Sequence, residues 1–410
     1  MIKKSNIAIC LFLMFGNGLL NAKTNLDTEN KVSLEKKDVI YKYFNISDKS
    51  RNLYKLFKQN VLAGDYSQAR KNAKKLFVNV NTLNNKNQIE VELANMALGE
   101  IDYLTDQKYK WRYMHLEAVN YFLSNKKSIG INDFVFGMIE LNDILIEKFG
   151  VMKARQVILD INSIVKDNFN NFSEKDKQYI QIKTNENMAE INFKEKKLRQ
   201  ALYSLSVANK YTKRLYTYSS LQESHLLFKK AFYIYNLNFD TDLSLNILKS
   251  ALKIADKILK EKNLDKNSVF LADINNFIGR ILSSGTKQEE ANLYLKRAIS
   301  IYKNTNSHMK EVKTTFQLIN SYKIINQLKL AEDYVKRLQN TVAEYFGKDS
   351  IEYADTLISE ADILNTSENF KEAIAKMNEA KSIYIKKYGS YSKEVRMLNS
   401  TLNYIKSQQD

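Results

Sequence analysis

Hydrophobic residues recur along most of the chain with the spacing of amphipathic helices rather than strands. In "VLAGDYSQARKNAKKLF" (61–77), Ala69, Ala73 and Leu76 stand at offsets of 0, 4 and 7 residues, which is one face of an α-helix. "ENFKEAIAKMNEAKSIY" at 368–384 repeats the same spacing with different residues. Proline is absent from all 410 residues, whereas a β-rich fold commonly uses proline in its turns. These features predict an all-α protein.

The same pattern returns at intervals of 40–47 residues. The residues that begin each occurrence, here called the anchors, are Ala69, Trp111, Ala154, Ala201, Ser244, Ala291, Ala331 and Ala373. A second apolar pattern lies nine and twelve residues before the anchors and indicates another helix that ends just ahead of each of them. We therefore predict about eight helix–turn–helix units, which must stack because a single unit cannot bury its apolar face alone.

These units resemble the tetratricopeptide-repeat (TPR) family, most clearly in "GDYSQA" (64–69), "FIGRIL" (277–282) and "NFKEAIAKMNEA" (369–380). The resemblance covers roughly residues 51–388. It implies a right-handed superhelical solenoid of about eight TPR-like repeats. Two features depart from the family: the repeat is about 42 residues long rather than about 34, and its helix-ending proline is missing.

Polar and glycine turns stand where the family places proline. In "YFGKDSIEY" and "YGSYSKEV", we expect Gly347 and Gly389 to end a helix by adopting positive φ. Ser350 and Ser392 follow at the spacing of N-caps for the next helices. The predicted organisation is a signal peptide at 1–22, a polar leader at 23–46, the solenoid at 47–388 and a C-terminal capping helix at 389–410.

The N-terminus has the three-part layout of a secretory signal. Lys3 and Lys4 precede an apolar stretch at 7–15, and small and polar residues lead to a predicted cleavage after Ala22. Cys10, the only cysteine, would leave with the signal, so the mature chain would contain no thiol. We expect an exported bacterial protein, periplasmic or secreted, without a membrane span after signal removal; a retained N-terminal anchor is the alternative.

Lysine and arginine exceed aspartate and glutamate by 63 to 46, for a formal net charge of +17. Such an excess can favour binding to nucleic acid, an anionic membrane or an acidic partner. The charges are dispersed rather than concentrated in basic blocks interleaved with aromatics, and export also argues against a nucleic-acid partner. A lysine- and asparagine-rich composition from an AT-rich genome is the simpler alternative.

The sequence offers no recognisable catalytic or metal-binding motif. His115, His225 and His308 lie in different repeats without a partner at metal-ligand spacing, and HExxH, GxxxxGK[ST] and GxSxG are absent. Trp111 replaces the usual small anchor, which indicates a wider helix interface or, alternatively, a ligand-stacking ring. We predict a protein that is not an enzyme and needs no cofactor.

The resemblance also implies a concave groove, lined by the first helix of each repeat, that holds an extended peptide or a partner helix. Basic and amide side chains gather at the groove positions of repeats 5 to 7, where they could bind a carboxylate and a peptide backbone. The candidate groove residues are Lys229, Tyr233, Asn236, Asn276, Arg280, Asn320 and Lys323. We expect Lys229, Arg280 and Lys323 to hold an acidic segment; a solvated groove without a ligand is the alternative.

The leading functional prediction is a non-catalytic protein–protein interaction scaffold of the bacterial cell envelope or exterior. The alternative is the extracytoplasmic sensing part of a TPR signalling protein, whose output domain would have to follow residue 410. Neither prediction names the partner or the oligomeric state.

Overall fold

The computed structural model describes residues 44–82, 87–105, 108–216 and 220–408. The predicted signal peptide, with Cys10, and the predicted leader up to residue 43 lie outside these ranges. The described residues are helical and contain no strand, which confirms the all-α prediction. None of their helices combines the length and the apolarity that a membrane span requires.

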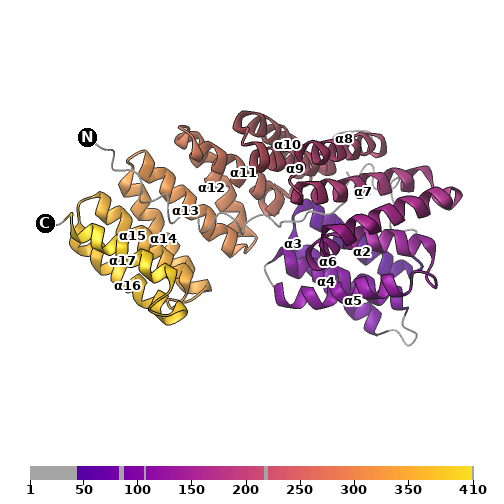
Figure 1. Ribbon diagram of the computed structural model, residues 1–410, viewed down its shortest axis with the longest axis horizontal. Helices are drawn as coiled ribbons and strands as arrows, with labels where there is room; N and C mark the ends of the chain where they lie inside the picture. The colour runs from indigo at the N-terminus through magenta and orange to yellow at the C-terminus, as the bar shows by residue number, and fades with distance from the viewer. Residues whose placement is uncertain (1–43, 83–86, 106–107, 217–219, 409–410) are drawn as a thin grey trace. The chain divides into compact units, whose positions relative to one another are not determined.

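The chain divides into two compact units, and the division falls inside helix α11. Residues 44–274 form what we call the N-terminal unit, and residues 275–408 form the C-terminal unit. Figure 1 follows them from indigo through magenta to orange and yellow. The helices are α2 (Asp48–Ala63), α3 (Tyr66–Asn81), α4 (Gln88–Leu104), α5 (Lys108–Ser124), α6 (Ile131–Asp167), α7 (Glu174–Lys194), α8 (Leu198–Leu215), α9 (Leu221–Asn238), α10 (Thr241–Glu261), α11 (Val269–Ser284), α12 (Gln288–Asn304), α13 (His308–Ile324), α14 (Leu328–Tyr345), α15 (Ile351–Thr366), α16 (Phe370–Tyr388) and α17 (Lys393–Lys406).

The helices come in antiparallel pairs, as the repeated pattern predicts. Within the described residues we count eight pairs. The third pair is α6, in which the non-helical Gly150 (φ 81°) forms a kink between two helices without an intervening loop. Each anchor lies near the start of the second helix of its pair. Ala69, Ala201 and Ala373 are fully buried, so the small anchors allow the close helix approach that the sequence suggests. The side chains of Trp111 and His115 lie outside the description.

The predicted turns are confirmed in the C-terminal unit. Gly347 and Gly389 have φ of 85° and 86°, a left-handed conformation that glycine adopts without strain. The Ser350 hydroxyl caps α15 by accepting the N–H of Tyr353 at 3.1 Å. Ser392 caps α17 in the same way, so both helices begin where the sequence predicts.

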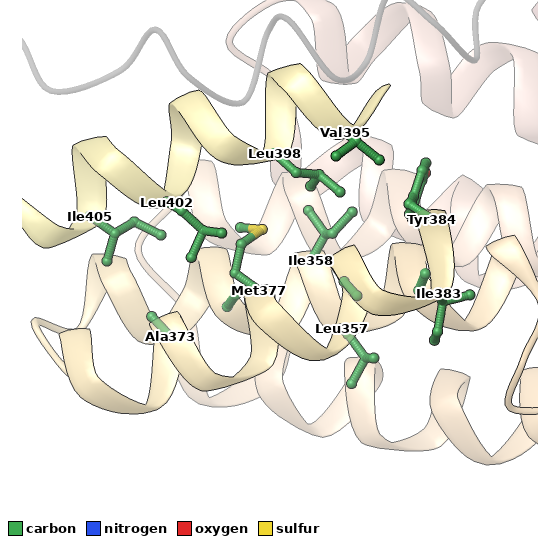
Figure 2. Close-up of a cluster of buried hydrophobic side chains, with 13 residues drawn as sticks. Leu357, Ile358, Ala373, Met377, Ile383, Tyr384, Val395, Leu398, Leu402 and Ile405 are labelled. Atoms are coloured by element: carbon green, nitrogen blue, oxygen red, sulfur yellow. The ribbon is translucent and has the colours of Figure 1, made fainter. Parts of the chain in front are cut away.

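Helix α17 covers the apolar face of the last repeat. Figure 2 shows Leu398 and Leu402 of α17 directed toward Ile358 of α15 and Met377 of α16. These side chains belong to one buried cluster, and the opposite side of α17 exposes polar residues such as Arg396. The predicted capping helix is therefore present and packs as expected.

Candidate functional site

The first helices of successive repeats contact one another through charged side chains in the N-terminal unit. Lys58 of α2 donates a hydrogen bond to Glu100 of α4 (Nζ–Oε2 2.9 Å) and forms an ion pair with Glu140 of α6 at 2.7 Å. The Tyr179 hydroxyl of α7 donates to the other oxygen of Glu140 at 2.6 Å. One buried ammonium thus bridges two carboxylates from different repeats.

A second set of polar contacts joins α7 and α9. Glu186 of α7 accepts hydrogen bonds from Lys229 Nζ at 2.5 Å and from Gln222 Nε2 at 3.2 Å, both on α9. Lys183, one turn before Glu186 and fully buried, donates to it at 3.4 Å. Buried charges of this kind are tolerated because each faces an opposite charge.

The pKa shifts in this network follow from burial and the surrounding charges. Burial opposes ionisation of Glu186, but Lys183 and Lys229 outweigh it and lower the pKa of Glu186 to about 2. Burial would likewise lower the pKa of Lys58, yet Glu100 and Glu140 raise it well above its ordinary value. These shifts favour an ionised Glu186 and a protonated Lys58, whereas burial raises the pKa of Glu100 despite its contact with Lys58.

Contacts in the N-terminal unit also return from its last helices to its first. The His225 Nε2–H of α9 donates to the Leu62 carbonyl at 3.1 Å, and the Val269 N–H at the start of α11 donates to the Gly64 carbonyl at 3.1 Å. Gly64 has φ 75°, and a Cβ atom there would lie 2.7 Å from the Phe270 nitrogen, so no larger residue fits without movement. Polar contacts thus link five first helices in a ring that closes through the His225–Leu62 hydrogen bond: α2, α4, α6, α7 and α9. The start of α11 joins the ring at Gly64, which follows α2.

Three predicted groove residues lie in the N-terminal unit, where their polar groups bond to the chain itself. Lys229 bonds to Glu186, and the buried Tyr233 donates its hydroxyl to Glu190 at 2.7 Å. Asn236 donates to the Phe232 carbonyl of its own helix at 2.7 Å.

The other four predicted groove residues lie in the C-terminal unit and are partly exposed. Asn276 and Arg280 are one turn apart on α11, and Asn320 and Lys323 are one turn apart on α13, so each pair shares a helix face. The Arg280 guanidinium lies over the Phe277 ring, 4.7 Å from its centre.

Lys323 forms an ion pair with Asp362 of α15, which brings α13 and α15 together at this surface. Burial lowers the pKa of the Lys323 ammonium to about 8. Asn365 lies one turn beyond Asp362 on the same helix. We call Asn276, Arg280, Gln317, Asn320, Lys323, Asp362 and Asn365 the amide surface.

Amide oxygens on this surface have no hydrogen-bond partner within the described residues. They belong to Asn276, Gln317 and Asn365, one on each of the first helices α11, α13 and α15. Gln317 is only 7% exposed, so a donor could reach its amide oxygen only after neighbouring side chains moved aside. A buried unpaired polar group costs about 1–3 kcal/mol, and a ligand N–H would remove that cost.

Sequence reasoning missed Gln317, Asp362 and Asn365 as parts of the surface. A periodicity signal was present for two of them, because Asp362 and Asn365 stand 11 and 8 residues before the anchor Ala373, as Asn320 and Lys323 do before Ala331. In the part of the chain that the structure describes, no cluster of three or more histidine, cysteine or acidic residues could hold a metal ion.

No protein-family model matches the sequence, and no curated protein matches it. Among solved structures, the chain is similar to a signal-transduction ATPase of the STAND class with a tetratricopeptide-repeat sensor from Pyrococcus horikoshii. The TM-score is 0.58 at 14% identity, over 90% of this chain and 53% of that one. The chain therefore has a TPR-type fold, and it spans about half of that protein.

Two further similar structures are a Rap protein complexed with Competence and Sporulation Factor and the apo form of RapI. The Rap complex gives a TM-score of 0.49 at 15% identity, over 88% of this chain and 97% of that one. RapI gives 0.49 at 14% identity, over 88% and 98%.

Proposed function

We propose that the chain is a non-catalytic interaction scaffold whose C-terminal unit binds an extended peptide segment of a partner protein along the amide surface. The unpartnered amide oxygens of Asn276, Gln317 and Asn365 carry this proposal. Backbone N–H groups of an extended peptide are the donors that such oxygens lack. The TPR-type fold supports the proposal, because its stacked helices present side chains of successive repeats along one surface.

The charges of the amide surface favour an acidic residue or a terminal carboxylate in that segment. Arg280 and Lys323 contribute two cations from neighbouring repeats, and Asp362 already pairs with Lys323. A ligand carboxylate would have to share or displace that pairing. The predicted contribution of Lys229 to the same site is not part of this proposal, because Lys229 pairs with Glu186 in the other unit.

The test is binding of the full-length chain to an array of random-sequence peptides. The double variant Arg280→Glu/Lys323→Glu should lose binding to the acidic peptides that the unaltered chain selects, by more than about tenfold. Lys371→Glu is the matched control, since Lys371 is exposed on the second helix α16. Equal binding by the double variant and the control would show that the amide surface is not the site.

We also propose that the protein is exported, supported by the basic, apolar and small-residue order of residues 1–22. Cell fractionation combined with N-terminal sequencing tests this. Recovery of a cytoplasmic chain that still begins at Met1 would contradict it.

A further inference from the structure

The last residues before α2 form a segment that is buried against three first helices of the N-terminal unit. Phe44 is 1% exposed and packs edge-on against Tyr54 of α2 and Phe136 of α6, at ring-centre distances of 6.2 and 6.4 Å. Ile46 is also buried. Sequence analysis assigned both residues to the polar leader, but their apolar side chains are part of this unit.

Buried carboxylates accept the backbone N–H groups of this segment. The Asn45 N–H donates to Asp133 Oδ1 of α6 at 3.0 Å, and the Ser47 N–H donates to Glu90 Oε1 of α4 at 2.5 Å. Both carboxylate residues are more than nine-tenths buried, in the first turns of their helices. Between these two N–H groups, the Ile46 N–H donates to the Phe44 carbonyl at 2.8 Å, so the segment turns at Asn45.

Side chains also donate to the carbonyl groups of the segment. The Asn45 carbonyl accepts from Asn87 Nδ2 at 2.5 Å, and the Ile46 carbonyl accepts from Arg51 Nη2 at 2.9 Å. The segment is therefore bound in the manner of a peptide ligand. Side chains of the unit form hydrogen bonds with its backbone, and its own Phe44 ring fills an apolar site.

We propose that α2, α4 and α6 form a second docking site, whose ligand is a short turned peptide of a partner protein with an aromatic residue two positions before an aliphatic one. Residues 44–47 occupy this site as an intramolecular ligand and define its chemistry. Because the segment is joined directly to α2, its effective concentration is high, and a partner peptide must displace it. The site lies in the N-terminal unit, so its test does not depend on whether the amide surface binds a peptide.

The experiment weakens the contacts of residues 44–47 with the unit and adds the same segment as a separate peptide. The probe is a fluorescent synthetic peptide of residues 40–49, with binding to the full-length chain followed by anisotropy. Asn45→Pro removes the N–H that Asp133 accepts, and the Phe44-to-Ile46 turn at this position (Ile46 N–H to the Phe44 carbonyl, 2.8 Å) suits the φ of proline. Asn45→Ala is the matched control, because it keeps the N–H and changes only an exposed side chain.

The Asn45→Pro chain should bind the probe at least about tenfold more tightly than the unaltered chain or Asn45→Ala. A probe in which alanine replaces Phe44 should not bind. Phe44→Leu, which keeps an apolar anchor, provides a second loosened chain with less risk to folding.

Four results would overturn the proposal. Equal binding by Asn45→Pro and Asn45→Ala would mean that the segment does not compete for the site. Absence of binding in both loosened chains, or loss of helical circular dichroism in both, would make the segment a structural strap only. A dimer on size-exclusion chromatography, formed by Asn45→Pro but not by Asn45→Ala, would identify the occupant as the segment of a second copy.

Discussion

The N-terminal unit gives the Lys58 ammonium two carboxylate partners, whereas the C-terminal unit leaves the Gln317 amide oxygen buried without a donor among the described residues. Both side chains lie on first helices, and both are more than nine-tenths buried. In the first case, the chain supplies the charges that a ligand could have supplied. In the second case, it retains an unfavourable group that a ligand can satisfy. One repeat architecture can therefore pair a buried polar group within the chain at one first-helix position and leave another such group unpaired.

The difference between the units concerns stability as well as binding. A buried ion pair is costly to form but much more costly to break on one side, so removal of one partner of the charge network should strongly destabilise the N-terminal unit. Unpartnered amides lower stability modestly and persist where function compensates for them. We therefore expect substitutions on the first helices to have opposite consequences in the two units.

The largest effect should follow from Lys58→Met, which leaves Glu100 and Glu140 buried without their shared cation. We expect a loss of about 3–5 kcal/mol in the free energy of unfolding of the N-terminal unit, measured by denaturant titration with hydrogen exchange. The control Lys74→Met, at an exposed position of α3, should change it by less than about 0.5 kcal/mol.

Adding Glu100→Gln and Glu140→Gln to Lys58→Met should recover part of that loss, because no unpaired buried charge then remains. A Lys58→Met chain as stable as the control would show that the network does not hold the unit together.

The N-terminal unit should lose stability as the pH falls. Burial lowers the pKa of His225 from 6.5 to about 3, although its bond to the Leu62 carbonyl opposes this. Below pH 6.5 the His225 side chain is protonated in the unfolded chain but stays neutral in the folded chain. The free energy of unfolding therefore declines by up to about 1.4 kcal/mol per pH unit until pH 3. His225→Gln keeps an N–H donor and should flatten this dependence, measured by hydrogen exchange in α2 and α9.

The C-terminal unit should lose stability in the opposite direction. Burial raises the pKa of Asp355 from 3.8 to about 7, partly offset by the Tyr384 hydroxyl, which donates to it at 2.6 Å. The folded chain keeps a proton that the unfolded chain releases, so stability declines between pH 3.8 and pH 7, also by up to about 1.4 kcal/mol per unit.

Asp355→Asn still accepts from Tyr384 and cannot ionise. It should remove the decline and stabilise α15 and α16 above pH 7, as followed by hydrogen exchange. An Asp355→Asn variant with an unchanged pH profile would contradict the assignment.

The smallest effect should come from Gln317→Met, which replaces an unpartnered amide by an apolar side chain of similar length. We expect unchanged stability or a gain of up to about 1 kcal/mol in thermal unfolding, together with weaker binding of the selected peptides. A large loss of stability would mean that Gln317 has a structural partner and would remove the contrast between the units.

The repeat pattern predicted the helix pairs because small anchors and apolar stripes are local features of the sequence. Ala69 and Ala373 are fully buried in equivalent places, and Ser350 caps the helix that its turn predicts. The contacts between the last and first helices of the N-terminal unit could not be predicted, because His225 and Leu62 are separated by 163 residues and no local pattern links them.

The candidate site was only partly predictable, since a sequence shows a charge but not what neutralises it. The repeat position of Lys229 predicts a ligand-binding cation, but Glu186, at the equivalent position one repeat earlier and 43 residues away, pairs with it. Lys58 and Glu100 are related in the same way, 42 residues apart. Opposite charges at matching positions of adjacent repeats are therefore a signal for internal pairing.

Helix α17 has a practical consequence for handling the protein. Its apolar side chains cover the cluster on α15 and α16, while Arg396 and Lys406 face water. Proteolysis between Gly389 and Lys393 that released α17 would expose this apolar cluster to solvent. Two nicked molecules could bury these clusters against each other, so slow degradation during storage would first be noticed as end-to-end aggregation rather than as unfolding.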